Sequence, residues 1–398
     1  MIAERAAALS VARVSDAGAF RDLEREWDAL YERSPARSVF LRWGWLYAWW
    51  EAFGEGHQLR IYAARDAAGR LVGLAPLCRR VEPSPWPIRV LTFLGTERVS
   101  SDFMDVLVAP ELEAEASSAL WDAIARDASD VDWIRWCDIL DSSVVARRIV
   151  PVAREAGWPV EDRLAEYCPF VTLPDSLETL LARRGKSLRD QYRRSARKLE
   201  AAGTTIAVDT DAATLPEALD SLYRLHEERW RRKGREGNFR DGRVRRFHER
   251  VVRAFAPRGL LRLYRLRVAD RTFAVLYALD DRGVLSYYQA GFDPAPPDSS
   301  MKPHDYSPGT VLIGTAMEDA IRRGRTEFDF LRGHEPAKFR WTDDYRVTRT
   351  MTVIPRGRWR GRAAMAAVRA NRGARGLARR LLRRPSLPAP PPAPGGGR

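Results

Sequence analysis

Four polar side chains in the second half of the sequence could move protons or stabilise negative charge. His226 offers an imidazole whose unperturbed pKa suits a general base, and His334, which is expected in a loop, is an equal rival. Asp329 could accept a proton or hold an amine, and the ammonium of Lys338 could stabilise an oxyanion. Each also has a structural alternative, namely a packed histidine, a strand-end carboxylate or a surface lysine. Residue type alone therefore leaves the catalytic assignment open.

A second feature is a helix start that could bind phosphate. Ser307 is a good N-cap and Pro308 suits the first helical position, ahead of the apolar run at 311–313. Gly309 lets a ligand come close, and the free N–H groups of a first helical turn, here including Thr310, bind phosphate. A strand-like segment and a polar loop precede this start. Strand, loop and helix start form the layout of a pyrophosphate cradle, although most such triplets only begin a helix.

These features suit acyl transfer from a coenzyme A thioester. That reaction needs a cradle for the pyrophosphate, a donor to the thioester oxygen and a route for the acceptor's proton. The sequence has no G-x-S-x-G elbow and no HExxH motif, and its carboxylates do not cluster at metal spacing. Its three cysteines, Cys78, Cys137 and Cys168, are isolated. We therefore expect no metal in catalysis.

The elements that must position these residues occur twice, in one order. Each half has a β-hairpin, further strand-like runs, a helix and a final strand. In the first half these are 59–77, 112–128 and 133–136, and in the second half 261–277, 308–323 and 327–330. The order predicts a duplicated mixed α/β domain. Aromatic residues at 43–50 predict a further helix packed on the core of the first half.

We expect domains at 1–168 and 169–355, followed by a tail at 356–398. Ser176 should cap a helix that runs to about Ala201, with Gly203 ending it; its many basic residues are either a solvated face or a dock for an anionic acceptor or phosphate. Gly333 and Pro336 predict that Lys338 lies in a shaped loop and not in a helix.

The net charge of +14 is concentrated in the tail. Twelve arginines and no acidic residue lie at 356–398, which leaves a nearly neutral body and makes nucleic acid an unlikely partner. A basic amphipathic helix is predicted at about 358–384, weakened by its glycines, and a disordered Pro/Gly-rich end at 385–398. The tail would either bind anionic membranes weakly or aid solubility. Without a signal peptide or membrane span, we expect a cytoplasmic protein, peripheral on the inner face of the membrane if the tail binds there.

The stretch 222–341 resembles the second domain of the FemAB-like branch of the Gcn5-related N-acetyltransferase (GNAT) superfamily. More narrowly, it resembles bacterial CelD-like (BioF2-like) N-acyltransferases. The matching pieces, in order, are His226–Gly234, Tyr288–Asp293, Ser307–Gly309 and Phe328–Lys338. The first half matches loosely, at 40–50 and 101–105. Two features depart from the pattern: Ala337 replaces the usual aromatic before the lysine, and the common Q/RxxGxG/A phosphate loop is absent.

The resemblance implies two tandem GNAT-like acyltransferase domains, with the working site in the second. An acyl group, in the first instance acetyl, would pass from acyl-CoA to an amine or a sugar hydroxyl, in cell-envelope or exopolysaccharide (cellulose-like) synthesis. Acyl-CoA would be a co-substrate, with no tightly bound cofactor, and the acceptor a small molecule or glycan. The implied cofactor-binding residues are Gln289, Ala290, Gly291, Ser307, Pro308, Gly309 and Thr310, and the implied substrate-binding residues are Trp230, Tyr288 and Arg332.

Two other functions stay open at this stage. One is an aminoacyl-tRNA-dependent transferase of the Fem type, favoured by the basic residues at 183–198 but opposed by the neutral body. The other is a non-enzymatic membrane or nucleic-acid adaptor that works through the arginine-rich tail.

Overall fold

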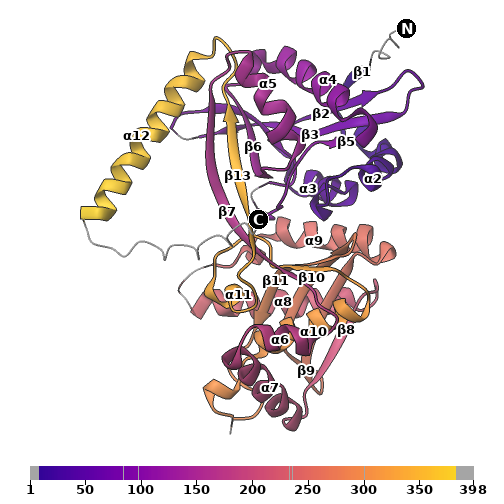
Figure 1. Ribbon diagram of the computed structural model, residues 1–398, viewed down its shortest axis with the longest axis vertical. Helices are drawn as coiled ribbons and strands as arrows, with labels where there is room; N and C mark the ends of the chain where they lie inside the picture. The colour runs from indigo at the N-terminus through magenta and orange to yellow at the C-terminus, as the bar shows by residue number, and fades with distance from the viewer. Residues whose placement is uncertain are drawn as a thin grey trace. The chain divides into compact units, whose positions relative to one another are not determined.

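A computed structural model describes residues 9–381 apart from 84, 97, 233, 235 and 300, and the side chains of 303 and 373–381 are also not described. The chain divides into two compact units (Figure 1). Unit 1 holds the residues up to Glu166 and those from Val347 onward, and unit 2 holds Tyr167–Arg346. The chain passes from unit 1 to unit 2 within strand β7 (Val160–Thr172) and returns within β13 (Tyr345–Val353).

Unit 1 is built on a mixed sheet with the strand order β1-β2-β3-β4-β6-β13-β7. Strands β4 and β6 are parallel, whereas β1 to β4 form an antiparallel meander and β13 is antiparallel to β6. The remaining strands are β1 (Ser10–Val14), β2 (Gln58–Arg65), β3 (Leu71–Glu82), β4 (Ile88–Phe93), β5 (Leu107–Val108), which pairs with β3, and β6 (Trp133–Leu140). The α-helices are α1 (Ala17–Asp22), α2 (Glu24–Arg33), α3 (Trp43–Phe53), α4 (Glu113–Arg126), α5 (Val150–Glu155) and α12 (Trp359–Leu381).

The aromatic segment forms a buried helix, as the sequence predicted. Trp45 and Trp49 of α3 are buried, and the Trp45 indole donates to Ser101 Oγ at 2.8 Å. Phe40 packs edge-on against Trp45 with ring centroids 4.9 Å apart. These tryptophans therefore belong to the core of unit 1.

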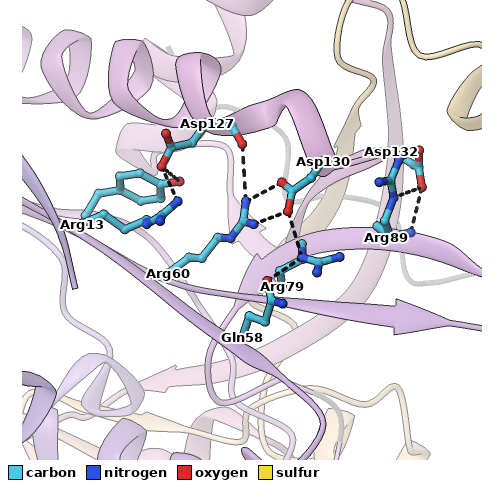
Figure 2. Close-up of polar contacts among 9 residues, drawn as sticks. Arg13, Gln58, Arg60, Arg79, Arg89, Asp127, Asp130 and Asp132 are labelled. Carbon is cyan, nitrogen blue, oxygen red and sulfur yellow. Dashed lines mark hydrogen bonds and ion pairs between the residues drawn. The ribbon is translucent and has the colours of Figure 1, made fainter. Parts of the chain in front are cut away.

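An ion-pair network binds the turn after α4 to the sheet of unit 1 (Figure 2). Neighbouring strands β1, β2, β3 and β4 each supply one arginine: Arg13, Arg60, Arg79 and Arg89. Asp130 accepts a hydrogen bond from Arg60 and forms an ion pair with Arg79 at 3.4 Å, and Asp132 accepts two hydrogen bonds from Arg89 at 3.0 Å. Asp127 pairs with Arg13 at 2.9 Å. Because each of the three carboxylates is paired with a guanidinium group, this acidic turn has a structural role.

Unit 2 has a sheet with the order β7-β12-β11-β10-β9-β8, in which β11 and β12 are parallel and every other neighbouring pair is antiparallel. Its strands are β8 (Thr205–Asp209), β9 (Leu261–Val268), β10 (Arg271–Asp281), β11 (Val284–Phe292) and β12 (Glu327–Asp329). Its α-helices are α6 (Leu177–Arg183), α7 (Lys186–Ala201), α8 (Leu215–Arg232), α9 (Gly242–Phe255), α10 (Pro308–Arg322) and α11 (Pro336–Phe339).

Helices cover both faces of this second sheet. Leu276 of β10 shares a core cluster with Leu188 of α7 and Leu312 of α10. Its neighbour Tyr277, whose side chain points to the other face, contacts His248 of α9 with ring centroids 5.6 Å apart. The two faces therefore carry different helices.

The predicted duplication is confirmed in the fold. In unit 1, β2, β3 and β4 are followed by α4 and then by β6, which pairs in parallel with β4. In unit 2, β9, β10 and β11 are followed by α10 and then by β12, which pairs in parallel with β11. The chain is thus a tandem of two similar mixed α/β domains.

Two local predictions were wrong. The basic helix expected from Ser176 to Ala201 is two helices, because Gly185 at φ 88° adopts a conformation that helical residues cannot share. Ser176 does cap the first of them, accepting from Thr179 N at 3.1 Å. Lys338 lies in the short helix α11 and not in a loop, because Pro336 serves as its first residue.

The basic amphipathic helix predicted at about 358–384 forms, as α12 (Trp359–Leu381). Helix α12 packs on the sheet of unit 1, where Met365 shares a core cluster with Trp133. The Trp133 indole donates to Gly361 O at 2.9 Å. A Cβ on Gly361 would lie 2.3 Å from Asp132 O, so this glycine permits the close approach of helix and sheet. The Pro/Gly-rich end predicted at 385–398 lies outside the described residues. None of the described helices is both long enough and apolar enough to cross a membrane.

Candidate functional site

The predicted phosphate cradle and strand β11 meet in unit 2. Gly309 and Leu312 of α10 line a narrow hollow together with Tyr287, Ala290 and Gly291 of β11. A Cβ on Gly309 would meet nothing within 4 Å, so the space beside the helix start is open. The structure therefore brings together two parts of the predicted cofactor site that lie apart in the sequence.

The Ser307 side chain does not cap the first turn of α10. The Ser307 hydroxyl bonds to the Thr310 hydroxyl at 2.8 Å and makes no capping bond to the helix backbone. Pro308 fills the first helical position, where the lack of an N–H costs nothing. Val311 N donates to Ser307 O at 3.1 Å, whereas the N–H groups of Gly309 and Thr310 have no acceptor within the helix, and the helix dipole favours an anion there.

Strand β11 has a β-bulge at its two adjacent tyrosines, Tyr287 and Tyr288. Tyr277 pairs with Gln289 and Ala278 pairs with Tyr287, so Tyr288 is the extra residue. Tyr288 contacts Tyr277 and His248, with ring centroids 5.2 and 5.5 Å away. Predicted to bind substrate, it packs instead on the face that carries α9. Gln289, predicted to bind the cofactor, accepts from Ala290 N through its own Oε1 at 3.2 Å.

Gly291 has a packing role in addition to its place in the hollow. A Cβ there would lie 3.0 Å from Leu225 Cβ and 3.1 Å from His226 N, both in α8. The missing side chain allows α8 to approach β11 closely.

His226 is a buried, neutral imidazole. Its Nε2 accepts from the Trp230 indole at 2.9 Å, and burial, with a smaller effect from Arg229, lowers its pKa to about 4. Its Nδ1 then carries the proton, and it has no hydrogen-bond partner among the described residues. To act as a base through Nε2, His226 would first have to lose its hydrogen bond from Trp230, the residue predicted to bind substrate. The contacts thus give both residues a packing role in α8.

Asp329 is also buried and holds the end of β12. Its Oδ1 accepts from Leu331 N at 2.7 Å, and its Oδ2 from Arg346 at 3.1 Å. Arg346 also binds Glu327, and its guanidinium lies 3.8 Å above the Phe170 ring. These contacts are those of a structural carboxylate. Arg346 was not predicted as a partner of Asp329, because it lies outside the motifs that the sequence analysis identified.

The Lys338 side chain bonds back to earlier residues of the segment that follows β12, and so closes this segment. Its Nζ donates to Arg332 O and lies 3.2 Å from Glu335 Oε2, and its side chain is only 12% exposed. Arg332, predicted to bind substrate, therefore contributes its carbonyl to this closure. His334 is exposed and forms no hydrogen bond with the described residues. A catalytic role for Lys338 or His334 stays a prediction.

Tyr287 is a site residue that the sequence analysis did not single out. It lines the hollow beside Gly309, and its ring lies 6.0 Å from Phe330 at the end of β12. Burial raises the pKa of Tyr287 to about 12; Arg229 lowers that pKa and Glu335 raises it. The bulge at Tyr288, which has no sequence signal, decides which of the two tyrosines faces the hollow.

Two further features bear on chemistry in the described part of the chain. No group of three or more His, Cys, Asp or Glu side chains is placed to hold a metal ion there. A wide open hollow of about 930 Å³ lies between α8, the turn at 236–240 and α9. Charges of both signs line it, including the ion pair of Glu227 with Arg245.

Comparison with known proteins supports the prediction of an acetyltransferase domain in unit 2. Residues 186–346 match the family model described as acetyltransferase (GNAT) domain. The chain is similar to the crystal structure of FemX, with 13% identity and a TM-score of 0.56 over 83% of this chain and 96% of that chain. It is also similar to the C-terminal domain (DUF2156) of an Agrobacterium fabrum protein named as a lysylphosphatidylglycerol synthetase, with 11% identity and a TM-score of 0.50 over 88% and 96%.

A conserved protein of unknown function from Bacteroides thetaiotaomicron is similar too, with 12% identity and a TM-score of 0.50 over 83% of this chain and 97% of that chain. No curated protein matches the sequence significantly. At these identities the likeness shows the fold. With the domain match, it confirms the tandem architecture and the resemblance to the FemAB-like branch; the narrower CelD-like resemblance stays a prediction.

Proposed function

We propose that this chain, whose residues 186–346 form a GNAT domain, transfers an acyl group from acyl-CoA to an amine or a sugar hydroxyl. The supporting observation is the meeting of the α10 start with β11 at the hollow lined by Gly309, Ala290 and Tyr287. The uncapped N–H groups of α10 would hold the pyrophosphate of the donor. The thioester would then lie along β11. Acetyl is the first acyl group to test, and the acceptor would belong to envelope or exopolysaccharide synthesis.

The proposed reaction is direct attack without a covalent enzyme intermediate. The acceptor nitrogen or oxygen attacks the thioester carbonyl, the carbon–sulfur bond breaks, and coenzyme A leaves as a thiolate. The acceptor loses one proton and the thiolate gains one. The Tyr287 phenol is protonated near neutrality, and burial raises its pKa further, so it can donate a hydrogen bond at the hollow. Positioning and hydrogen bonds to the developing charge would supply most of the rate enhancement.

The experiment is a titration of acetyl-CoA combined with a thiol-release assay against a panel of amines and sugars. We expect Gly309→Glu to abolish donor binding, since its carboxylate would enter the space of the pyrophosphate. Gly242→Glu is the matched control, because it places the same carboxylate in the first turn of α9. Equal donor affinity in two folded variants would reject the placement at α10.

Aminoacyl transfer is the second candidate, favoured by a specific surface of unit 2. Helix α7 exposes five basic residues: Lys186, Arg193, Arg194, Arg197 and Lys198. Such a face suits a nucleic-acid backbone, whose binding weakens steeply as salt rises. Transfer from aminoacyl-tRNA, with no thiol release from acyl-CoA, would replace the first proposal with this one.

The adaptor hypothesis needs a different deletion from the one that the sequence suggests. Removing 356–398 would also remove α12, whose Met365 packs on Trp133. A truncation after Leu381 spares this packing. Loss of membrane or nucleic-acid binding in that truncated protein, without any acyltransferase activity in the full chain, would favour an adaptor.

A further inference from the structure

Unit 1 contains a pocket lined by α12 and by the adjacent strands β6, β13 and β7 of its sheet. Its volume is about 180 Å³, and it is lined by Trp133 and Arg135 of β6, Thr350 and Thr352 of β13, Arg163 of β7, and Glu82, Glu161, Met365, Val368 and Arg372. All of these residues belong to unit 1. The pocket is separate from the proposed acyl-transfer hollow, which lies in unit 2.

Arginines outnumber carboxylates around this pocket. Glu82 is shared by Arg80 and Arg135, at 2.8 and 2.5 Å. Glu161 is shared in the same way by Arg369 and Arg372, at 2.9 and 2.8 Å. Each carboxylate thus already serves two guanidinium groups, and neither is left to neutralise a further cation.

Arg163 is the cation without a partner. Among the described residues it forms no hydrogen bond and no ion pair, although it lines the pocket beside Glu161. Arg163 is an exposed residue whose pKa is nevertheless lowered, by partial burial of its guanidinium and by the like charges of Arg372 and Arg135, against smaller opposing effects of Cys137 and Glu161. A guanidinium held among cations, with no anion bound to it, is the arrangement that an anionic ligand would complete.

The rest of the lining suits a phosphate group. The pocket is large enough for a phosphate with a small substituent, and Thr350 and Thr352 are buried residues with hydroxyl donors. The Arg135 guanidinium lies 5.0 Å from the centre of the Trp133 ring, which holds it at one wall. Arginine binds phosphate through its planar fork, and threonine hydroxyls add further hydrogen bonds.

We propose that this pocket of unit 1 binds a phosphate monoester, with Arg163 as its principal ligand. The phosphate could come from a small soluble metabolite or from a lipid headgroup, and the chemistry of recognition is the same. The proposal does not depend on the acyltransferase activity of unit 2.

The test compares two charge-removing variants of the full-length protein at constant ionic strength. Arg163→Gln removes the proposed ligand. Arg25→Gln is the matched control, because Arg25 is also an exposed arginine of unit 1 that has no partner among the described residues, and it lies outside the pocket. Both variants are made in the Gly309→Glu background, so that phosphate binding at α10 does not contribute.

Binding of inorganic phosphate and of glycerol 3-phosphate is measured by calorimetry, and binding to vesicles of phosphatidic acid or of phosphatidylcholine by co-sedimentation. We expect at least about a tenfold loss of phosphate affinity in Arg163→Gln and no loss in Arg25→Gln, because a charge-assisted hydrogen bond is lost only in the former.

Dependence on Arg163 for the soluble esters assigns the site to a metabolite, and dependence only for phosphatidic acid vesicles assigns it to a lipid headgroup. Equal affinities of the two variants for every probe, or no binding at all, would overturn the proposal. A melting curve of each variant confirms that unit 1 is folded.

Discussion

Replacing Lys338 by methionine distinguishes a catalytic role of this lysine from a structural role in holding the segment that follows β12. Methionine keeps most of the apolar stem and removes the ammonium. The structure shows what the ammonium holds: Arg332 O through a hydrogen bond, and Glu335 through an ion pair at 3.2 Å. With a side chain 12% exposed, this hydrogen bond is largely shielded from water.

The loss of stability can be worked out from these two contacts. A hydrogen bond to a charged donor contributes about 1.5–3 kcal/mol. The ion pair adds little, about 0–1 kcal/mol, because the Glu335 side chain is 63% exposed. We therefore expect unit 2 to lose about 2 kcal/mol, which lowers its melting temperature by roughly 5 °C. This exceeds the loss of under about 1 kcal/mol that an exposed lysine would give.

The assay measures turnover per folded molecule beside a denaturant melt, with Glu335→Gln as the control that breaks the ion pair and keeps Lys338. If Lys338 stabilises the oxyanion, turnover falls by roughly 10²–10³ in Lys338→Met even at temperatures where the variant is fully folded. If it only closes the segment, turnover stays within a few-fold and stability falls as stated. An unchanged melt, or an equal loss in Glu335→Gln, would refute the assignment of the stabilising contact to Arg332 O.

Three further predictions follow from single contacts. Burial lowers the pKa values of His226 and His248 to about 4 and 3, so below about pH 6.5 the unfolded chain binds protons that the folded chain does not. The two histidines therefore cost no stability above that pH, and the free energy of unfolding falls as the pH drops towards 4. A pH series of urea melts should show a shallower fall in His248→Phe. Gly314→Ala should destabilise unit 2 in thermal melts, because its Cβ would lie 2.3 Å from the Tyr192 ring, whereas Gly324→Ala, whose cost is the positive φ of 69° alone, should cost less. Met365→Ala should lower the stability of unit 1 by about 2–5 kcal/mol in denaturant melts, and a loss below 0.5 kcal/mol would show that α12 is not docked.

The sequence predicted the elements of the fold well where local signals were strong. The hairpins, the buried aromatic helix and the start of α10 at Pro308 all follow from alternation, spacing or capping residues. It failed where a single position changes the backbone. Gly185 divides the predicted helix into α6 and α7, and Pro336 begins a helix where a shaped loop was predicted.

The candidate site could be predicted only in part, for a related reason. The helix start at Ser307–Thr310 carries its own local signals, so its place beside β11 was predictable from the order of elements. The roles of Tyr287 and Tyr288 depend on a bulge in the register of β10 and β11, which no local pattern announces. Asp329 and Lys338 acquire their partners, Arg346 and Arg332 O, from tertiary contacts.

The duplication supports our proposal that the acyl donor binds in unit 2 alone. Helix α4 has the position in unit 1 that α10 has in unit 2, after the three-stranded meander and before the parallel strand. Its first turn contains Glu113 and Glu115, whose carboxylates already satisfy the positive end of the helix dipole and would repel a phosphate. Glu113 is further engaged by Arg147 and Arg148, at 3.1 and 3.0 Å. The first turn of α10 contains no acidic residue and includes Gly309, which leaves its donors open to a ligand. The same helix start is therefore closed by its own side chains in one copy and open in the other.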